Sequence, residues 1–206
     1  PATQPVYSPM RVSGLTNVTN ISQDGYLAQS NEPERFTHVC ATANGEAYCW
    51  GNGSVGQLGA TPPGYVSRRA VPVKVDRPAG LSPSDKVKKV EVGIWHSCML
   101  MNSGKVFCWG TNMYGHLGAN LALGALPNNR SVKPIPILSG TGGIPAGERI
   151  IDLAAGANRG CAVVENGHSY CWGLNDAGQI GDGTHIDARA PTESLFLRPT
   201  QNRYIY

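Results

Sequence analysis

The sequence predicts an all-β fold assembled from repeated groups of short strands, and three observations lead to this prediction. Of its 206 residues, 26 are glycine and 15 are proline, while only 15% are charged; this balance favours short strands and turns over helices. The chain also repeats itself, because Trp50, Trp109 and Trp172 stand in similar local sequences 59 and 63 residues apart. Finally, the six cysteines fall two to each copy of this repeat.

Each copy contains the signature of one β-hairpin. A first cysteine, a turn glycine and a Cys-Trp-Gly run follow one another, and a Gly-x-Leu/Ile-Gly run comes shortly afterwards. Asn-Gly between two strands is the strongest short-range hairpin signal, because a type I′ turn needs positive φ at both central residues. The hairpins span residues 38–51, 96–110 and 160–173, and the glycine runs span 56–59, 115–118 and 178–181.

Two further strand-like segments precede each hairpin, a proline-containing one and an apolar one ending near a glycine. Four short strands separated by turn residues are the sequence form of a propeller blade. We therefore predict a partial β-propeller of three four-stranded blades plus a fragment. The expected segments are Pro9 to Val12 with Val18 to Ile21, Val71 to Val75 with Val87 to Gly93, and Ile135 to Leu138 with Ile150 to Gly156, while Ala190 to Thr192 begin a fourth unit.

These units predict one propeller-type domain over residues 1–206. Its repeats are expected at about 8–69, 70–131 and 132–189, with a partial fourth unit at 190–206. Blades bury their faces against their neighbours, so an open set of three leaves two faces without a partner. We expect missing blades or a second chain to complete the propeller.

Counting outward from each turn pairs the cysteines within their own hairpin. In the first hairpin, the Asn44-Gly45 turn places Cys40 opposite Cys49 at a non-hydrogen-bonded pair, where Cα atoms lie ~4.5 Å apart, within disulfide range. The other two turns carry one more residue, with glycine in the left-handed position, and the same counting holds. The predicted disulfides are Cys40–Cys49, Cys98–Cys108 and Cys161–Cys171.

Zinc binding is the competing explanation for the cysteines, because His38 and His96 each lie two residues before one. The spacing is not the short Cys-x₂₋₄-Cys of structural zinc sites, and Arg159 and Gly160 replace the histidine in the third copy. We therefore expect no metal and no cofactor. Three local disulfides indicate an oxidising, extracytoplasmic location, secreted or at the cell surface.

Charge and hydropathy exclude two classes of partner. The net charge of +3 is spread along the chain, and its only local concentrations are Arg68-Arg69 and the lysines within 86–89. Such small clusters favour solvated strand faces over a nucleic-acid footprint. No stretch approaches the ~20 apolar residues that span a bilayer. We expect neither nucleic-acid binding nor membrane insertion within this chain.

The run His-x-Cys-Ala, turn glycine, Tyr-Cys-Trp-Gly and Gly-Gln-Leu-Gly resembles the regulator of chromosome condensation repeat. It is most similar to the cysteine-paired form of exported bacterial proteins, over roughly residues 8 to 195. The resemblance implies a β-propeller, usually of seven blades, of which this sequence supplies three and a fragment. Implied functions include nucleotide exchange on a small GTPase, inhibition of secreted β-lactamases, light sensing and cell-surface recognition. The nucleotide-exchange role belongs to a nuclear protein, so three disulfides argue against it here. Light-sensing relatives use clustered tryptophans, and only Trp95 lies outside the repeat's own Trp-Gly position, which argues against light sensing.

The sequence offers no nucleophile with a base, no paired carboxylates and no phosphate loop. We therefore predict that the chain is not an enzyme, with a hydrolase using His185 and Asp187 as the catalytic alternative. His38 and His96 occupy the repeat's own histidine position and are expected to be buried and structural. His116 stands where the other copies have Gln57 and Gln179, and His168 and His185 have no partner that the sequence reveals.

We predict an extracytoplasmic recognition module, a bacterial adhesin or surface-binding domain for a protein or cell-surface glycan. The alternative is a secreted proteinaceous inhibitor of an enzyme such as a β-lactamase. Specificity should come from loop positions that differ between repeats, and Trp, Tyr and Arg are enriched among binding hot spots. Trp95 could instead pack on a neighbouring blade and Tyr114 could merely cover a turn. The candidate residues are Ile94, Trp95, Met113, Tyr114, Asn158, Arg159, Asp176 and, within the insertion from Tyr26 to Phe36, Phe36.

Overall fold

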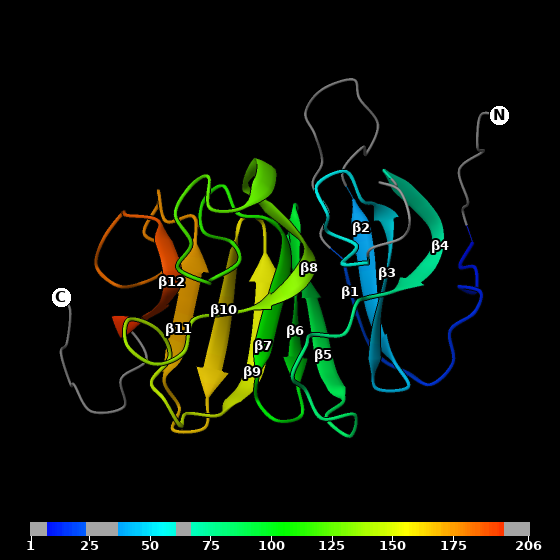
Figure 1. Cartoon of the computed structure of the whole chain (residues 1–206), viewed down its shortest axis with the longest axis horizontal. Coiled ribbons are helices and arrows are strands. Elements are labelled where there is room, and N and C mark those ends of the chain that lie inside the picture. The colour runs from blue at the N-terminus through cyan, green and yellow to red at the C-terminus, as the bar shows by residue number, and fades with distance from the viewer. Residues whose placement is uncertain (1–7, 24–36, 61–66, 196–206) are drawn as a thin grey trace.

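The computed structural model describes residues 8–23, 37–60 and 67–195, and it consists of three four-stranded antiparallel sheets standing side by side (Figure 1). The all-β propeller-type fold is confirmed. In each sheet the strands are neighbours in chain order, and we call the sheets the first, second and third blade. The first comprises β1 (Val18–Gln23), β2 (His38–Ala43), β3 (Glu46–Asn52) and β4 (Arg68–Lys74); the second β5 (Val87–Val92), β6 (His96–Met101), β7 (Val106–Thr111) and β8 (Arg130–Pro136); the third β9 (Ile150–Gly156), β10 (Arg159–Val164), β11 (Ser169–Gly173) and β12 (Ala188–Glu193).

A short 3₁₀ turn, η1 (Pro127–Asn129), leads into β8. Among the described residues, no helix is long and apolar enough to cross a membrane.

The proline-containing strands pair differently from the predicted repeat units. β4 pairs with β3, through Cys49 and Val73, so it closes the first blade instead of opening the second. Likewise Thr192 of β12 pairs with Cys171, and the segment expected to begin a fourth unit completes the third blade. Residues 9–12 form no strand. Proline lacks the N–H that a central strand must donate, so these strands take the sheet edge that has no further partner.

The predicted hairpin registers are confirmed. Cys40 faces Cys49, Cys98 faces Cys108 and Cys161 faces Cys171, and each pair forms a disulfide with a Cα–Cα distance of 4.1 Å. Asn44 and Gly45 both have positive φ, 52° and 72°, as a type I′ turn requires. The turn residues therefore fix the register that brings each cysteine opposite its partner.

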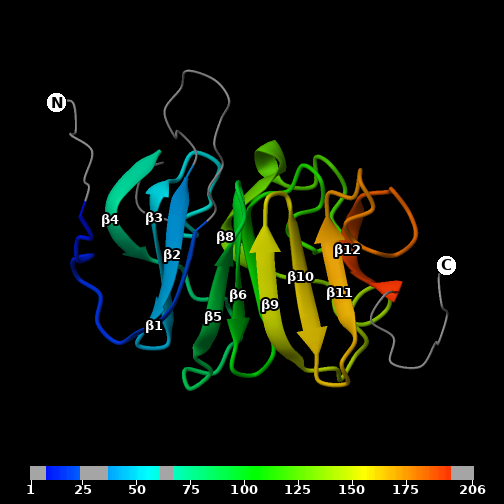
Figure 2. The same cartoon turned by 180° about the vertical axis from the view of Figure 1, so that it is seen from behind.

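The core lies at the two contacts between neighbouring blades, and the same two kinds of face pack together at each contact. One face of a blade carries its disulfide, and it packs against the face of the next blade that carries the tryptophan. Trp109 and Trp172 are fully buried at these two contacts. The three sheets and their two contacts can be followed from behind in Figure 2. We call the two sides of a blade its disulfide face and its tryptophan face.

Each buried indole is held by the glycine run of the preceding blade. Trp109 donates its Nε1–H to the main-chain oxygen of Gln57 at 2.8 Å, and Trp172 donates to that of His116 at 2.9 Å. A Cβ on Gly59 would lie 2.5 Å from the Trp109 Nε1. The last glycine of the run is therefore needed for the close approach of the ring.

Candidate partner-binding edge

Strand direction brings the variable loops to one edge of the molecule. In each sheet, neighbouring strands are antiparallel and follow chain order, so the odd-numbered strands run in the same direction. The loops that follow these strands therefore lie at one edge of the molecule (Figure 1, upper edge). We call this the loop edge. Among the described residues, its second- and third-blade loops are 93–95, 112–129, 157–158 and 174–187.

The loops of the second and third blades interlock on this edge. Ile94 donates its backbone N–H to the oxygen of Ala157 at 2.9 Å, and Asn120 donates to the oxygen of Arg189 at 2.8 Å. Arg189 returns a hydrogen bond from its guanidinium to the oxygen of Leu121 at 3.2 Å. The predicted residues therefore sit on a connected scaffold and not on independent loops.

The predicted contact residues differ in how far they reach solvent. Met113 and Tyr114 are exposed, whereas Ile94, Trp95, Asn158 and Arg159 are each half-buried. Tyr114 lies edge-on to the ring of His116, with centroids 5.5 Å apart, so it covers that turn and still presents one side to solvent. Asp176 is exposed and accepts a hydrogen bond from Gln179 Nε2 at 2.7 Å. Phe36 and the insertion that begins at Tyr26 lie outside the described residues.

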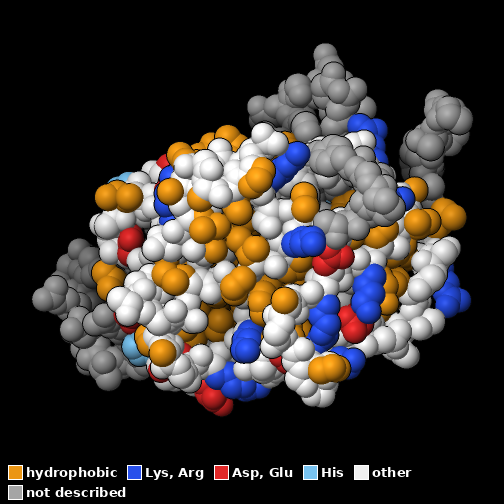
Figure 3. Space-filling model, viewed as in Figure 1, with side chains coloured by type: hydrophobic (Ala, Val, Ile, Leu, Met, Phe, Trp, Pro, Cys, Tyr) orange, Lys and Arg blue, Asp and Glu red, His pale blue; other side chains and the backbone are white. Residues whose placement is uncertain are grey.

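Two further apolar residues on this edge were missed by the sequence reasoning. Leu123 and Ile186 are 57% and 74% exposed, in the loops that follow β7 and β11. Both residues lie deep in loops whose lengths differ, so the other copies of the repeat offer no equivalent position for comparison. With Met113 and Tyr114 they form what we call the apolar loop set. In Figure 3, hydrophobic and uncharged side chains predominate above the second and third blades, while most Lys and Arg lie lower and to the right.

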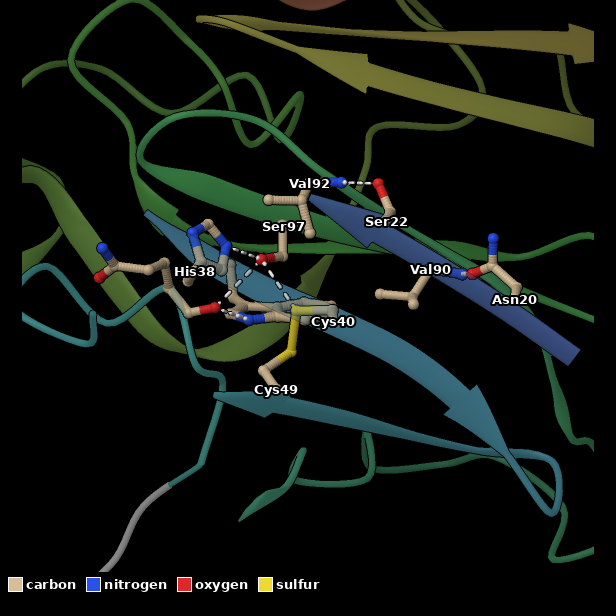
Figure 4. Close-up of a disulfide and its surroundings, with 10 residues drawn as sticks. Asn20, Ser22, His38, Cys40, Cys49, Val90, Val92 and Ser97 are labelled. Carbon is tan, nitrogen blue, oxygen red and sulfur yellow. Dashed lines mark hydrogen bonds between the residues drawn. A yellow bond between two sulfur atoms is a disulfide. The ribbon is translucent and has the colours of Figure 1, made fainter. Parts of the chain in front are cut away.

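The repeat histidines are buried and lie at the blade contacts. His38 Nε2 lies 2.7 Å from Ser97 Oγ on the neighbouring blade (Figure 4), and that hydroxyl donates to the oxygen of Gln57 at 3.0 Å. Ser97 therefore accepts from the histidine. Burial lowers the pKa of His38 to about 3, so the ring is neutral in ordinary conditions.

The other two buried histidines stack on each other beneath the loop edge. The rings of His96 and His116 are 5.2 Å apart. Burial lowers the pKa of His96 well below its ordinary value, and neighbouring His116 and His38 lower it further. Burial also lowers the pKa of His116 to about 4, opposed by the nearby side chain of Asn158. Neutral, enclosed rings of this kind support packing; they are not placed to exchange protons with a substrate.

The residues of the catalytic alternative are engaged separately. His185 Nδ1 lies 3.3 Å from the main-chain oxygen of Asp176, and the Asp187 carboxylate accepts the N–H of Asn175 at 2.9 Å. His168 Nδ1 lies 2.7 Å from Glu193 Oε1, a partner that the sequence did not reveal. Within the described ranges, no group of three or more His, Cys, Asp or Glu side chains could hold a metal ion.

A cleft of about 730 Å³ lies at the opposite edge, between the hairpin turn of the second blade and the segment before β9. Its charged rim ties these turns together: Arg149 donates to the oxygen of Asn102 at 3.0 Å, and Glu148 accepts from Asn166 Nδ2 at 2.7 Å. Arg149 and Glu148 are thus already used within the chain, and the loop edge is the better candidate.

Comparison with known proteins agrees with the geometry. The family model of the regulator of chromosome condensation (RCC1) repeat matches residues 44–100 and 103–163, and a second model of this repeat matches 87–115 and 150–179. The E3 ubiquitin-protein ligase HERC2 of Homo sapiens is 34% identical over 146 residues, which are 71% of this chain and 3% of that protein. The secretion-regulating guanine nucleotide exchange factor of Mus musculus is 28% identical over 214 residues, 96% of this chain and 40% of that protein.

Solved structures share the fold at lower identity. Human WBSCR16 superposes with a TM-score of 0.71 and 19% identity over 90% of this chain, and yeast RCC1 (Prp20) with 0.65 and 21% over 91%. The chain spans 42% and 38% of those two structures, and well under half of the curated relatives. With three disulfide-bearing blades and two family models matched across them, the chain belongs to the regulator of chromosome condensation repeat family.

Proposed function

We propose that this chain is an extracytoplasmic recognition module that binds a protein partner through its loop edge. The observation that carries the proposal is the apolar loop set: four side chains, 38% to 74% exposed, in the loops of one edge of the sheet scaffold. Large apolar side chains exposed together, and rimmed by polar groups, are typical of interaction sites. Relatives support a protein as the partner, since the yeast structure contains RCC1 bound to Kap60 and another concerns Prp20p binding to Gsp1p and histones.

Within this function, an adhesin or surface-binding domain is the specific form we favour. A secreted inhibitor of an enzyme such as a β-lactamase is the second form, because an apolar edge of this kind could also cover an active site. A cell-surface glycan is the alternative ligand for the adhesin, since Tyr114 and half-buried Trp95 present aromatic rings on which a sugar could stack.

The location is proposed from the disulfides. Each closes a hairpin of 9 or 10 residues in sequence separation, and the cytosol keeps such thiols reduced. All six cysteines are paired. We therefore propose secretion or display at a cell surface. This location is tested by alkylating the free thiols of the producing cell before lysis and then fractionating it. Protein found in the cytosolic fraction with all six cysteines alkylated would contradict the proposal.

The binding test compares the loop edge with the opposite edge. The protein would be immobilised and exposed to cell-surface proteins, to a glycan array and to secreted hydrolases. Replacing Tyr114 or Trp95 with Ala should weaken binding of the captured partner by at least ~1 kcal/mol each, about fivefold in Kd, with the melting temperature nearly unchanged. Lys105→Ala, at the opposite edge, is the matched control and should bind as the parent does. Equal loss of stability and binding would assign both aromatic residues to packing.

The nature of the captured partner then separates the forms of the proposal. A surface protein or glycan supports the adhesin, whereas one hydrolase whose activity falls on binding supports the inhibitor. A nucleotide-release assay with a small GTPase is included because a relative carries the name of an exchange factor. Accelerated release that Tyr114→Ala leaves intact would overturn the proposal.

A further inference from the structure

The cleft at the edge opposite the loop edge has a repeat-equivalent counterpart that is almost closed. The open cleft, of about 730 Å³, follows the hairpin of the second blade, and at the same place after the first blade the cavity is only about 10 Å³. Main-chain hydrogen bonds fix this equivalence, since Val75 donates to Ala47 in one copy and Ile137 donates to Val106 in the other. We call the two places the open cleft and the closed cleft.

Arg77 fills the closed cleft. It belongs to the lining, and its guanidinium donates to the main-chain oxygens of Ser82 and Asp85, at 2.5 and 2.7 Å. Counted from the equivalent main-chain bonds, the residue in its place beside the open cleft is the exposed Ser139. A serine side chain is too short to cross this space, so the second cleft stays open.

The segment that Arg77 clamps has the same turn in both copies. Asp85 donates its backbone N–H to the oxygen of Ser82 at 2.9 Å, and Glu148 donates to the oxygen of Pro145 at 3.2 Å. The backbone of this segment therefore keeps its turn without the arginine. The two clefts differ mainly in the side chains that line them.

The charge at the rim also differs between the copies. Three residues before the second cysteine of the hairpin, the closed cleft has Glu46 and the open cleft has Lys105. Glu46 is half-buried and pairs with Lys74 and Lys86, at 3.5 and 3.9 Å. Lys105 is exposed, and its ammonium has no ion-pair or hydrogen-bond partner among the described residues. The open cleft therefore carries a cation that is available to a ligand.

Behind this cation the lining of the open cleft is apolar. The other two charged residues of the lining, Arg149 and Glu148, are hydrogen-bonded within the chain, so two cations stand against one carboxylate. Clefts of roughly 300–1,000 Å³ with an apolar lining and few polar groups are typical of small-molecule sites. The apolar lining residues that are at most 7% exposed are Val106, Phe107, Ile137, Ile144 and Ile150.

We propose that the open cleft binds a small organic anion, whose apolar body lies on the aliphatic lining and whose carboxylate pairs with the Lys105 ammonium. Charge complementarity selects the anion, and the volume and lining select a small molecule with an apolar body. The closed cleft does not bind this ligand, because Arg77 occupies the space and Glu46 repels a carboxylate. The site is distinct from the loop edge and lies across the sheets from it.

Titration of the full chain with decanoate at neutral pH, followed by amide NMR and calorimetry, tests the proposal. Decanoate should bind saturably and shift the amide signals of residues 103–107 and 137–150. Decylammonium has the same apolar body and the opposite charge, and it should bind about fivefold more weakly or worse, since an exposed charge pair is replaced by a repulsion.

Two variants give the open cleft the side chains of the closed one. Ser139→Arg restores the filling side chain at an exposed position, and it should weaken decanoate binding by about tenfold or more. Lys105→Glu restores the rim charge, and it should weaken decanoate about fivefold or more while strengthening decylammonium. Thr141→Arg is the matched control: it adds the same charge at an exposed position of the same loop, outside the lining, and should bind decanoate within about twofold of the parent.

Other outcomes would overturn the proposal. Decanoate that shifts no amide in the two ranges, or that binds Ser139→Arg as it binds the parent, would place the ligand elsewhere. Equal binding of the two probes to the parent would remove the preference for an anion. An apolar peptide with a free C-terminal carboxylate that binds the same residues more tightly than decanoate would make the cleft a peptide groove. Tyr114→Ala should leave decanoate binding unchanged, so this proposal and the loop-edge proposal fail separately.

Discussion

The tryptophan faces of the first and second blades carry equivalent tryptophans, Trp50 and Trp109, in opposite surroundings. Trp109 is sealed beneath Gly59 and bonded to Gln57, while Trp50 is half-buried with no described acceptor. The hairpins around both are equally regular, with the same cysteine register. A blade therefore forms its own strands and disulfide locally, but only the adjoining blade buries its apolar face.

Acid should produce the largest effect, because the three buried histidines lie at the packed contacts. Their folded pKa values lie below the ordinary 6.5 through burial, at about 3 for His38 and about 4 for His116. Between these values and 6.5, the unfolded chain binds more protons than the folded one, so stability falls as pH falls. Each pH unit below 6.5 should remove up to about 1.4 kcal/mol per histidine. Denaturant unfolding at pH 7, 6 and 5 measures this, and an unchanged midpoint would contradict it.

Removing one ring from each face tests the comparison directly. Trp109→Ala should cost about 3–5 kcal/mol, since it empties a fully buried site and removes one of the two donors to the Gln57 oxygen. Trp50→Ala should cost far less at concentrations where the chain is monomeric. Chemical denaturation of both variants gives the two values. Equal losses would mean that Trp50 is packed as firmly as Trp109.

The disulfides should also differ between packed and open faces. Five of the six cysteines are buried, and Cys161, on the disulfide face of the third blade that no other described blade covers, is partly exposed. Each bridge closes about ten residues and contributes roughly 2 to 3 kcal/mol in the chain-entropy model. Mild reduction followed by alkylation and mass spectrometry should label the 161–171 pair first. Earlier labelling of Cys40 and Cys49 would contradict the order, and any bridge between repeats would contradict the register.

The sequence predicts those features that depend on local register, and it does not predict the strand pairing between distant segments. The cysteine register follows from turn length, which is local, so all three disulfides could be derived. The assignment of β4, β8 and β12 to the preceding blade depends on pairing across long loops, although the edge preference of proline could have indicated it. Leu123 and Ile186 lie in loops of unequal length, where repeat alignment supplies no equivalent position. Exposure at Ile21 could not be distinguished from burial at Val90, since both are apolar residues on similar strands.

The glycine runs provide the finest test of the comparison, because two equivalent glycines share a backbone conformation and lie on a blade face that another described blade covers and on one that none does. Gly59 has φ of 65° and Gly181 has φ of 76°, so an alanine is strained at both by a similar amount. At Gly59 the added Cβ would also lie 2.5 Å from the Trp109 Nε1, and the ring would have to move. Gly59→Ala should therefore cost about 1–3 kcal/mol more than Gly181→Ala in the monomer, the usual penalty of overpacking. The denaturation midpoints of the two variants measure the difference in stability. Intrinsic tryptophan fluorescence reports whether the Trp109 indole shifts in Gly59→Ala alone. If both variants lose the same stability, an equivalent ring already lies over Gly181 in the monomer, and the third blade is not open in the way that its strand order indicates.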